Sequence, residues 1–203
     1  MKRLHQKIKG RGSSDNPINR FEGNYIDYDL DEETGEKPHP KTTFLTDHTK
    51  EIISYNKSPD IPFNAGLNVY RGCEHGCIYC YARPFHEYLG FSAGLDFESK
   101  IMVKHKAPEL LKKTLQSAKW KPQVIAMSGI TDCYQPIERK LLLTRKCLSV
   151  LAEYRNPVGI ITKNHLITRD IDILKELNEY NCVSTTISVT SLDNKITELM
   201  EPR

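Results

Sequence analysis

Three cysteines in one short stretch are the residues of this chain best suited to chemistry. Cys73, Cys77 and Cys80 have the spacing Cys-x3-Cys-x2-Cys. Thiolates at this spacing can wrap around one soft metal centre, and Gly72 and Gly76 permit the tight, positive-φ turns that wrapping requires. Three such ligands would fill three corners of a 4Fe-4S cluster and leave the fourth iron open to the amino and carboxylate groups of a small molecule.

Zinc is the competing metal for the same three thiols. It prefers tetrahedral sites, and His75 or His86 could supply the fourth ligand of a Cys3His site. His75 could alternatively be a spacer that faces solvent or bonds to the backbone, and this role is preferred. The position of the loop favours the cluster, because the thiols follow an expected strand and precede the first helix, where active sites form in parallel α/β folds.

The elements that would position this loop begin near Gly66. From there, short β-branched runs alternate with helical patterns, which is typical of βα units around a parallel sheet. The expected strands cover 66–70, 123–128, 158–162 and 183–190. The expected helices begin at Pro108, at Pro136 and after a capping Thr168. In the helix from Pro136 the inward residues are Ile137, Leu141, Thr144, Leu148 and Leu151. In the helix after Thr168 they are Ile171, Leu174 and Leu177.

The fold class expected from this pattern is α/β with too few βα units for a closed barrel, so the chain looks truncated at its C-terminus. The region from 63 to 203 supplies only four βα units at roughly 30 residues each. A last helical pattern, Leu192, Ile196 and Leu199, has barely begun when the chain stops. We therefore expect a missing C-terminal part or partner, and an exposed parallel edge at strand 183–190.

Residues 1–62 are polar and rich in turn residues, and we expect them to form an irregular, partly disordered leader. Its first residues are basic: Lys2, Arg3, Lys7, Lys9 and Arg11. A solvated, flexible arm is the expected role of this segment, and a phosphate-binding arm is the alternative.

Composition narrows the class of protein further. The 203 residues, of which 38% are hydrophobic, suffice for one sizeable domain. Six cysteines are too few for a disulfide scaffold of this length, and neither a signal peptide nor an apolar run of about 20 residues is present. The net charge of +3 is too small to indicate nucleic acid by itself. We expect a cytoplasmic protein with no membrane segment.

The cysteine stretch, with the aromatic Tyr79 before Cys80, resembles the signature loop of the radical S-adenosylmethionine (SAM) superfamily. The longer stretch 68–83 resembles a subgroup of bacterial proteins related to spore photoproduct lyase, and the likeness extends from about Phe63 to Arg203. The resemblance implies a partial (β/α) barrel with a 4Fe-4S cluster that cleaves SAM reductively, and a 5′-deoxyadenosyl radical that abstracts hydrogen from an unknown substrate. It also implies an electron donor such as a flavodoxin or ferredoxin, and kinship alone suggests a substrate related to nucleic acid.

Polar residues after the second strand are the first candidates for binding SAM. In the superfamily this position often carries a Gly-Glu pair that receives the methionine amino group, whereas here Ile130 follows Gly129. The residues that could take over this role are Ser128, Thr131 and Asp132. Asp132 could instead cap the helix that Pro136 begins.

The other candidates follow the third and fourth strands or lie in the cysteine loop. Lys163 could anchor the SAM carboxylate or an anionic substrate, or could face solvent. Ser188 and Thr190 would share one face of their strand, where similar proteins contact the ribose. Tyr79 would offer its ring or backbone to the adenine, or else would be an aromatic core residue.

Cys133 is a candidate for quenching a radical, because spore photoproduct lyases use a thiol hydrogen donor in this neighbourhood, although that thiol precedes the comparable Ser-Asp segment. Cys147 and Cys182 are interpreted as small apolar residues of a helix and a strand.

Two other functions compete with the radical enzyme. A non-enzymatic iron-sulfur protein for electron transfer would normally supply a fourth cluster ligand and would not need polar strand ends. A zinc-stabilised module that binds nucleic acid through the basic arm would need a longer arm and an aromatic platform.

Overall fold

The computed structural model describes residues 8–21 and 40–202. The chain divides into two compact units, each of which is treated separately. The cysteine-loop unit comprises the described residues of Met1–Leu45, Arg71–Met102 and Thr190–Arg203. The sheet unit comprises Thr46–Tyr70 and Val103–Val189.

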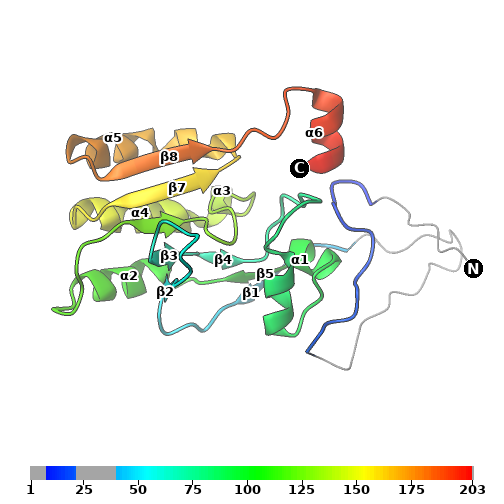
Figure 1. Cartoon of the computed structure of the whole chain (residues 1–203), viewed down its shortest axis with the longest axis horizontal. Coiled ribbons are helices and arrows are strands. Elements are labelled where there is room, and N and C mark those ends of the chain that lie inside the picture. Colours follow the sequence, from blue (N-terminus) through cyan, green and yellow to red (C-terminus); the bar gives the residue numbers. More distant parts are fainter. Residues whose placement is uncertain (1–7, 22–39, 203) are drawn as a thin grey trace, which may run out of the picture. The chain divides into compact units, whose positions relative to one another are not determined.

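The sheet unit is built on five strands in the order β2-β3-β6-β7-β8 (Figure 1). Their bounds are β2 Ile53–Tyr55, β3 Ala65–Leu67, β6 Ile125–Met127, β7 Val158–Thr162 and β8 Val183–Ile187. Strands β3, β6, β7 and β8 are parallel, and β2 adds an antiparallel edge to β3. The predicted strands and their parallel pairing are thus confirmed, but strands β3, β6 and β8 are shorter than predicted.

Helices α2 (Ala107–Leu115), α4 (Leu143–Glu153) and α5 (Ile171–Glu179) belong to the same unit. Helix α2 packs against α4 and α4 against α5 (Figure 1). All residues of β3 and β6 are buried, as expected for parallel strands of a central sheet. The fully buried core includes Leu111, Ile125, Met127, Leu148, Leu151 and Ile160.

The helix predicted from Pro136 is interrupted. Leu142 takes a left-handed conformation with φ of 56° and separates α3 (Glu138–Leu141) from α4. Of the predicted inward residues, Ile137, Thr144, Leu148 and Leu151 are buried and Leu141 is half-buried.

The predicted start of the third helix is wrong in detail. A 3-10 helix, η2 (His165–Asp170), precedes α5. The side-chain cap is at the start of η2, where Asn164 rather than Thr168 accepts from Leu166 N. The Thr168 hydroxyl donates to the carbonyl of His165 instead. Ile171 is exposed and Ile173 is buried, whereas Leu177 is buried as predicted.

The cysteine-loop unit contains the 3-10 helix η1 (Arg83–Leu89) and the short helices α1 (Leu95–Ser99) and α6 (Asn194–Met200). A three-stranded sheet has the order β1-β5-β4, formed by β1 Thr43–Thr46, β5 Lys100–Val103 and β4 Tyr70–Arg71.

The region predicted to be an irregular leader contains two strands, β1 and β2, in its described part. Arg11 is only 3% exposed, so the prediction of a solvated arm is wrong at this residue. Lys2, Arg3 and Lys7 lie outside the described residues, and the domain boundary at 62 stays a prediction.

The mixed α/β class is confirmed. In the described part of the chain the five-stranded sheet ends at β2 and β8, and β8 is the exposed parallel edge that the sequence predicts. A partial barrel and a missing C-terminal part stay proposals. No helix among the described residues has the length and apolar character needed to cross a membrane.

Candidate functional site

The cysteine loop follows β4 directly and is shaped by two glycines. Gly72 and Gly76 have φ of 80° and 66°, which confirms that both turns need the left-handed conformation that glycine adopts most easily. Cys73 N donates to Phe97 O at 2.9 Å, which anchors the start of the loop, and Cys80 N donates to Cys77 O at 3.3 Å within the loop.

The three thiols differ in burial. Cys73 and Cys77 are buried and Cys80 is half-buried. Cys73 packs with Ala82 and Phe97 in a small apolar cluster, and Cys80 packs against it. The donor type therefore fits an iron-sulfur cluster, since three cysteine thiols lie in one short, partly apolar loop.

The side chains of the loop are not arranged around one point. Across residues 8–21 and 40–202, no group of three or more His, Cys, Asp or Glu side chains is gathered closely enough to hold a metal ion. This applies equally to the zinc alternative, because neither His75 nor His86 completes a group with the thiols. His86 is instead buried between the rings of Phe91 and Phe97, where burial lowers its pKa to about 4.

Two of the predicted cofactor residues contact each other in this unit. The hydroxyls of Tyr79 and Thr190 are 2.8 Å apart, and the Glu201 carboxylate accepts hydrogen bonds from both. Ile78 N also donates to Met200 O at 3.0 Å, which ties the cysteine loop to the end of α6. Tyr79 is 47% exposed, so the alternative of an aromatic core residue is wrong.

Asp132 connects the ends of two neighbouring parallel strands in the sheet unit. Its carboxylate accepts from the Thr162 hydroxyl at 2.7 and 2.9 Å, from Lys163 N at 3.1 Å and from Tyr134 N at 2.8 Å. Helix α3 begins only at Glu138, with Ile137 at its N-cap, so Asp132 does not cap that helix. The prediction that polar groups gather after these strands is confirmed.

The residues before Asp132 are also held by the backbone around them. Ser128 has φ of 71°, and its hydroxyl accepts from Cys133 N at 2.9 Å. Thr131 is buried and donates its hydroxyl to Tyr70 O at 2.9 Å. A Cβ on Gly129 would meet Phe63 no closer than 3.7 Å, an ordinary van der Waals contact.

Contrary to the prediction, Ser188 and Thr190 do not share a face of one strand, because neither lies in β8. Strand β8 ends at Ile187, so the alternation of a strand does not apply to residues beyond it. Ser188 N still donates to Thr162 O at 2.9 Å, which places Ser188 beside the end of β7. Lys163 is half-buried in the same neighbourhood.

The other three cysteines are free thiols within the sheet unit. Cys133 is 1% exposed, and burial, with a smaller contribution from Asp132, raises the pKa of its thiol well above the usual value. Burial likewise raises the pKa of the Cys147 thiol in α4. The Cys182 thiol donates to the carbonyls of Arg155 and Tyr180.

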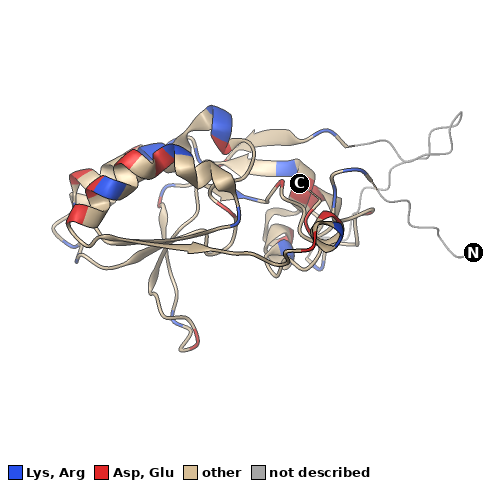
Figure 2. Cartoon of the chain, turned by 90° about the horizontal axis from the view of Figure 1, so that it is seen from above, with Lys and Arg blue, Asp and Glu red and all other residues tan. Residues whose placement is uncertain are grey.

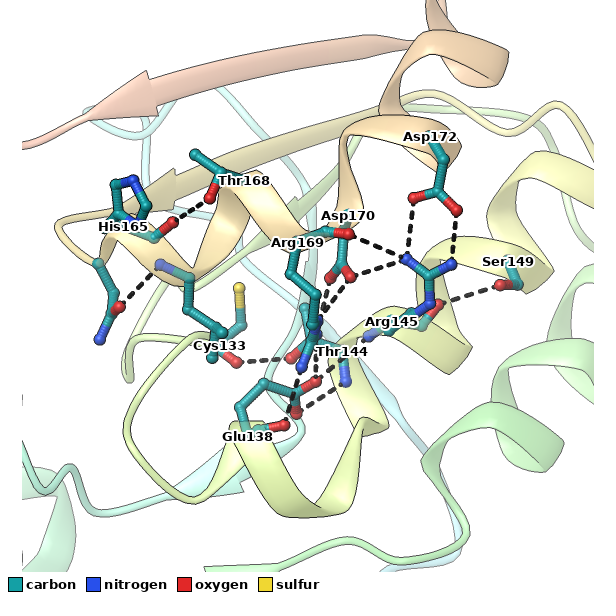
Figure 3. A network of polar contacts seen from close by, with 12 residues as sticks. Cys133, Glu138, Thr144, Arg145, Ser149, His165, Thr168, Arg169, Asp170 and Asp172 are labelled. Carbon is teal, nitrogen blue, oxygen red and sulfur yellow. Dashed lines mark hydrogen bonds and ion pairs between the residues drawn. The ribbon is translucent and has the colours of Figure 1, made fainter.

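Sequence reasoning missed a network of charges around the Asp132 loop (Figure 3). The carboxylates of Glu138 and Asp170 are fully buried, and Arg169 bonds to both, at 2.9 Å and 2.7 Å. Arg145 connects Asp170 with the exposed Asp172. The regular spacing that identifies apolar faces carries no information on such pairs, because their partners come from separate elements.

Glu138 also explains the break before α4. Its carboxylate accepts from Thr144 N at 3.1 Å and Arg145 N at 3.4 Å, in the first turn of α4, and from the Tyr70 hydroxyl. A carboxylate is favoured at a helix N-terminus, where backbone N-H groups lack helical partners. The Thr144 hydroxyl in turn donates to Cys133 O at 2.6 Å, so this network holds the loop that carries Asp132 and Cys133.

Comparisons with known proteins agree with the motif. The pattern of the Radical SAM superfamily matches residues 67–203. An uncharacterised protein of Mycobacterium tuberculosis (strain H37Rv) is 35% identical over 144 residues, which cover 70% of this chain and 42% of the relative. An uncharacterised protein of Methanocaldococcus jannaschii is 29% identical over 153 residues, covering 75% of this chain and 54% of the relative.

The chain thus spans about half or less of the length of these relatives. No solved structure matches it significantly. These relatives lend no support to the narrower likeness to spore photoproduct lyase, because they are uncharacterised. The cysteine loop and the match over residues 67–203 lead to one family: the chain belongs to the radical SAM superfamily.

Proposed function

We propose that the chain binds a 4Fe-4S cluster through Cys73, Cys77 and Cys80 and acts on SAM. When bound, such a cluster supplies an electron for the reductive cleavage of SAM, from which a 5′-deoxyadenosyl radical abstracts hydrogen from a substrate. The observation that carries the proposal is the Cys-x3-Cys-x2-Cys loop with two left-handed glycines, inside the region that matches the superfamily. Binding would draw together thiols that are not gathered in the structure.

Residues of both units are proposed to contact SAM, and each unit is taken in turn. In the cysteine-loop unit, Tyr79 and Thr190 are already joined by a hydrogen bond and would contact the nucleoside part of SAM. In the sheet unit, the proposed contacts are Ser128, Gly129, Thr131, Asp132, Lys163 and Ser188. Because the hydroxyl of Thr131 and the carboxylate of Asp132 have partners in the protein, these two would act mainly by shaping the loop.

The wider setting of the reaction belongs to the same proposal. A small electron carrier such as a flavodoxin or ferredoxin would reduce the cluster, in the reducing environment of the cytoplasm. A substrate related to nucleic acid rests only on the likeness of stretch 68–83 to spore photoproduct lyase. Helices α2, α4 and α5 each carry both signs of charge, which is unlike the basic stripe of a nucleic-acid surface. Figure 2 shows Lys and Arg interspersed with Asp and Glu on the helices that face the viewer.

Release of 5′-deoxyadenosine tests the proposal. The chain is purified anaerobically, loaded with iron and sulfide, and reduced with dithionite in the presence of SAM. We expect 5′-deoxyadenosine from the wild type and none above background from Cys77→Ser. Cys147→Ala, which removes a buried thiol of α4 outside the loop, is the matched control and should retain the product.

Two outcomes would contradict the proposal. A loaded wild type that contains the cluster but neither binds SAM nor releases product would favour an electron-transfer protein. A chain that binds one zinc ion in preference to iron through the same thiols would favour the zinc module.

A further inference from the structure

A segment near the N-terminus is built into the support of the cysteine loop. We call residues 8–21 the N-terminal strap. It contains the buried residues Ile8, Arg11 and Asn19, although it has no helix or strand. Its polar contacts are made mainly with residues 83–98 of the same unit, and they form two groups, one around Glu98 and one around Glu87 and Asp96.

The first group is centred on the fully buried carboxylate of Glu98. Gly12 N and Ser13 N each donate to it at 2.9 Å. Arg11 donates to the backbone carbonyl of Glu98 at 2.5 Å and to Thr42 Oγ1 at 3.0 Å. The strap therefore surrounds a charge that would otherwise be costly to bury.

The same carboxylate holds the cation that supports the cysteine loop. Arg83 Nη2 lies 2.6 Å from Glu98 Oε1. The Arg83 guanidinium also donates to the carbonyl oxygen of Cys77, from Nη2 at 2.9 Å and from Nε at 3.3 Å. It lies over the ring of Phe97, which packs against Cys73. One ion pair thus connects the strap with two of the three cysteines.

The strap also lies against the loop itself. A Cβ on Gly12 would overlap the carbonyl oxygen of Gly76, and a Cβ on Gly76 would come within 2.8 Å of Glu98 Oε2 and 3.1 Å of Gly12 N. Only glycine fits at both places. The turn between Cys73 and Cys77 therefore packs directly against the strap and the Glu98 carboxylate.

The second group fixes the other end of the strap. Asn16 and Asp96 exchange two hydrogen bonds, at 3.0 and 2.9 Å, and Leu95 N donates to Asp15 O at 2.9 Å. Asn19 donates to the carbonyls of Glu87 and Phe91. The strap is therefore held at two places, by residues 11–13 at Glu98 and by residues 15–19 along residues 87–96.

We propose that the N-terminal strap, Glu98 and Arg83 form a positioning device for the cluster ligands, an inference that rests on the proposed function. Glu98 orients Arg83, Arg83 holds the backbone of Cys77, and the strap holds Glu98 and the Gly76 turn. A buried ion pair adds little to stability compared with well-packed apolar residues, but it specifies one arrangement. Here that arrangement sets both the path of the loop and the charge next to it.

The charge makes the proposal testable through the cluster's midpoint potential, since net charge and hydrogen bonds near a cluster tune that potential. Glu98→Gln keeps the shape of the side chain and leaves the Arg83 cation uncompensated, so the potential should rise. Arg83→Gln leaves the Glu98 anion uncompensated, so the potential should fall. A residue that only stabilises the fold would not move the potential in opposite directions in the two variants.

A second measurement needs no cluster. Gly12→Ala pushes the strap away from Gly76, so backbone amides of residues 72–80 should exchange hydrogen at least about tenfold faster in the apo chain. Gly159→Ala, in β7 of the sheet unit, is the control. A Cβ on Gly159 would meet Val124 at 3.9 Å, an ordinary van der Waals contact. The loaded Gly12→Ala protein should also lose its iron to a chelator faster than the wild type does.

The outcomes separate this inference from the proposed function. Failure of the wild type to assemble a cluster would overturn the proposed function, and the exchange experiment would still decide whether the strap positions the loop. Unchanged exchange in Gly12→Ala, or potentials that move in the same direction in Glu98→Gln and Arg83→Gln, would overturn the positioning role even if the loaded wild type cleaves SAM.

Discussion

At the scale of single residues, the described part of this chain uses carboxylates to connect segments that are distant in sequence. Asp132 joins the ends of β6 and β7, and Glu98 joins the N-terminal strap to Arg83. Each accepts more than one hydrogen bond from backbone N-H groups. Removing such an acceptor takes this partner from several donors at once.

Asp132→Ala should lower the free energy of unfolding by about 1–3 kcal/mol for each hydrogen-bond donor that stays buried and loses its partner. The donors at stake are the Thr162 hydroxyl and the backbone N-H groups of Tyr134 and Lys163. Urea denaturation measures the loss. Asp60→Ala, at an exposed loop position, should change stability by no more than about 0.5 kcal/mol, and an equal loss in both variants would contradict the role of Asp132.

His86 should make stability depend on pH. Burial lowers its folded-state pKa to about 4 from a usual value of 6.5, so between these values the unfolded chain binds the extra proton. The free energy of unfolding should therefore fall as the pH drops from 6.5 to 4, by up to about 1.4 kcal/mol per pH unit from this group. Denaturation at several pH values, compared between the wild type and His86→Leu, measures the effect. Parallel curves for the two proteins would show that His86 does not titrate in this range.

At the scale of elements, the charge network decides where helices begin. The carboxylate of Glu138 receives the first N-H groups of α4, and Arg169 connects Glu138 with Asp170 just before α5 (Figure 3). The network therefore ties η2 and the start of α5 to the start of α4. This link also sets which side of α5 faces the core. Because η2 ends at Asp170, Ile173 rather than Ile171 is buried.

Arg169→Met should be strongly destabilising, by about 3–5 kcal/mol, because it leaves two buried carboxylates without their shared cation. Asp172→Asn breaks an ion pair of the same network at an exposed position, with a carboxyl whose pKa Arg145 lowers to about 2. It should cost far less than Arg169→Met, because solvent screens an exposed ion pair. Thermal and urea unfolding of both variants measure the difference. Similar losses of stability would show that the buried ion pairs of the network contribute no more than the exposed one.

At the scale of the whole molecule, the two units can respond differently to a ligand, because the three cysteines all belong to one of them. A ligand that binds only the folded state stabilises the part that binds it, by about 2.7 kcal/mol at a concentration of 100 times its Kd.

Loading with iron and sulfide should therefore raise the melting temperature by about 5–10 °C for a chain of this size, and a chelator should reverse the shift. If two transitions are seen, the shift should belong to the one in which residues 71–102 lose their hydrogen-exchange protection. Cys73→Ser should abolish the shift and Cys182→Ser should not. A shift that survives Cys73→Ser would place the iron elsewhere.

The sequence by itself determined the cysteine loop, the family and the parallel strands. These depend on short-range features that one segment carries alone: the spacing of three thiols, the glycines between them, and apolar runs that need burial. The same reasoning was wrong for Arg11, for the cap of α5 and for the break at Leu142, because the partners that decide these positions come from other segments.

Only the tertiary structure decided which polar side chains meet. It joined Asp132 to Thr162, Tyr79 to Thr190 and Glu98 to the N-terminal strap, across separations of 30, 111 and 85 or 86 residues. A buried charge needs a partner but can take it from any element that the fold brings near, so its choice leaves no periodic signal along the chain. The sequence thus determined which chemistry is available, and the packing of distant segments decided what holds it in place.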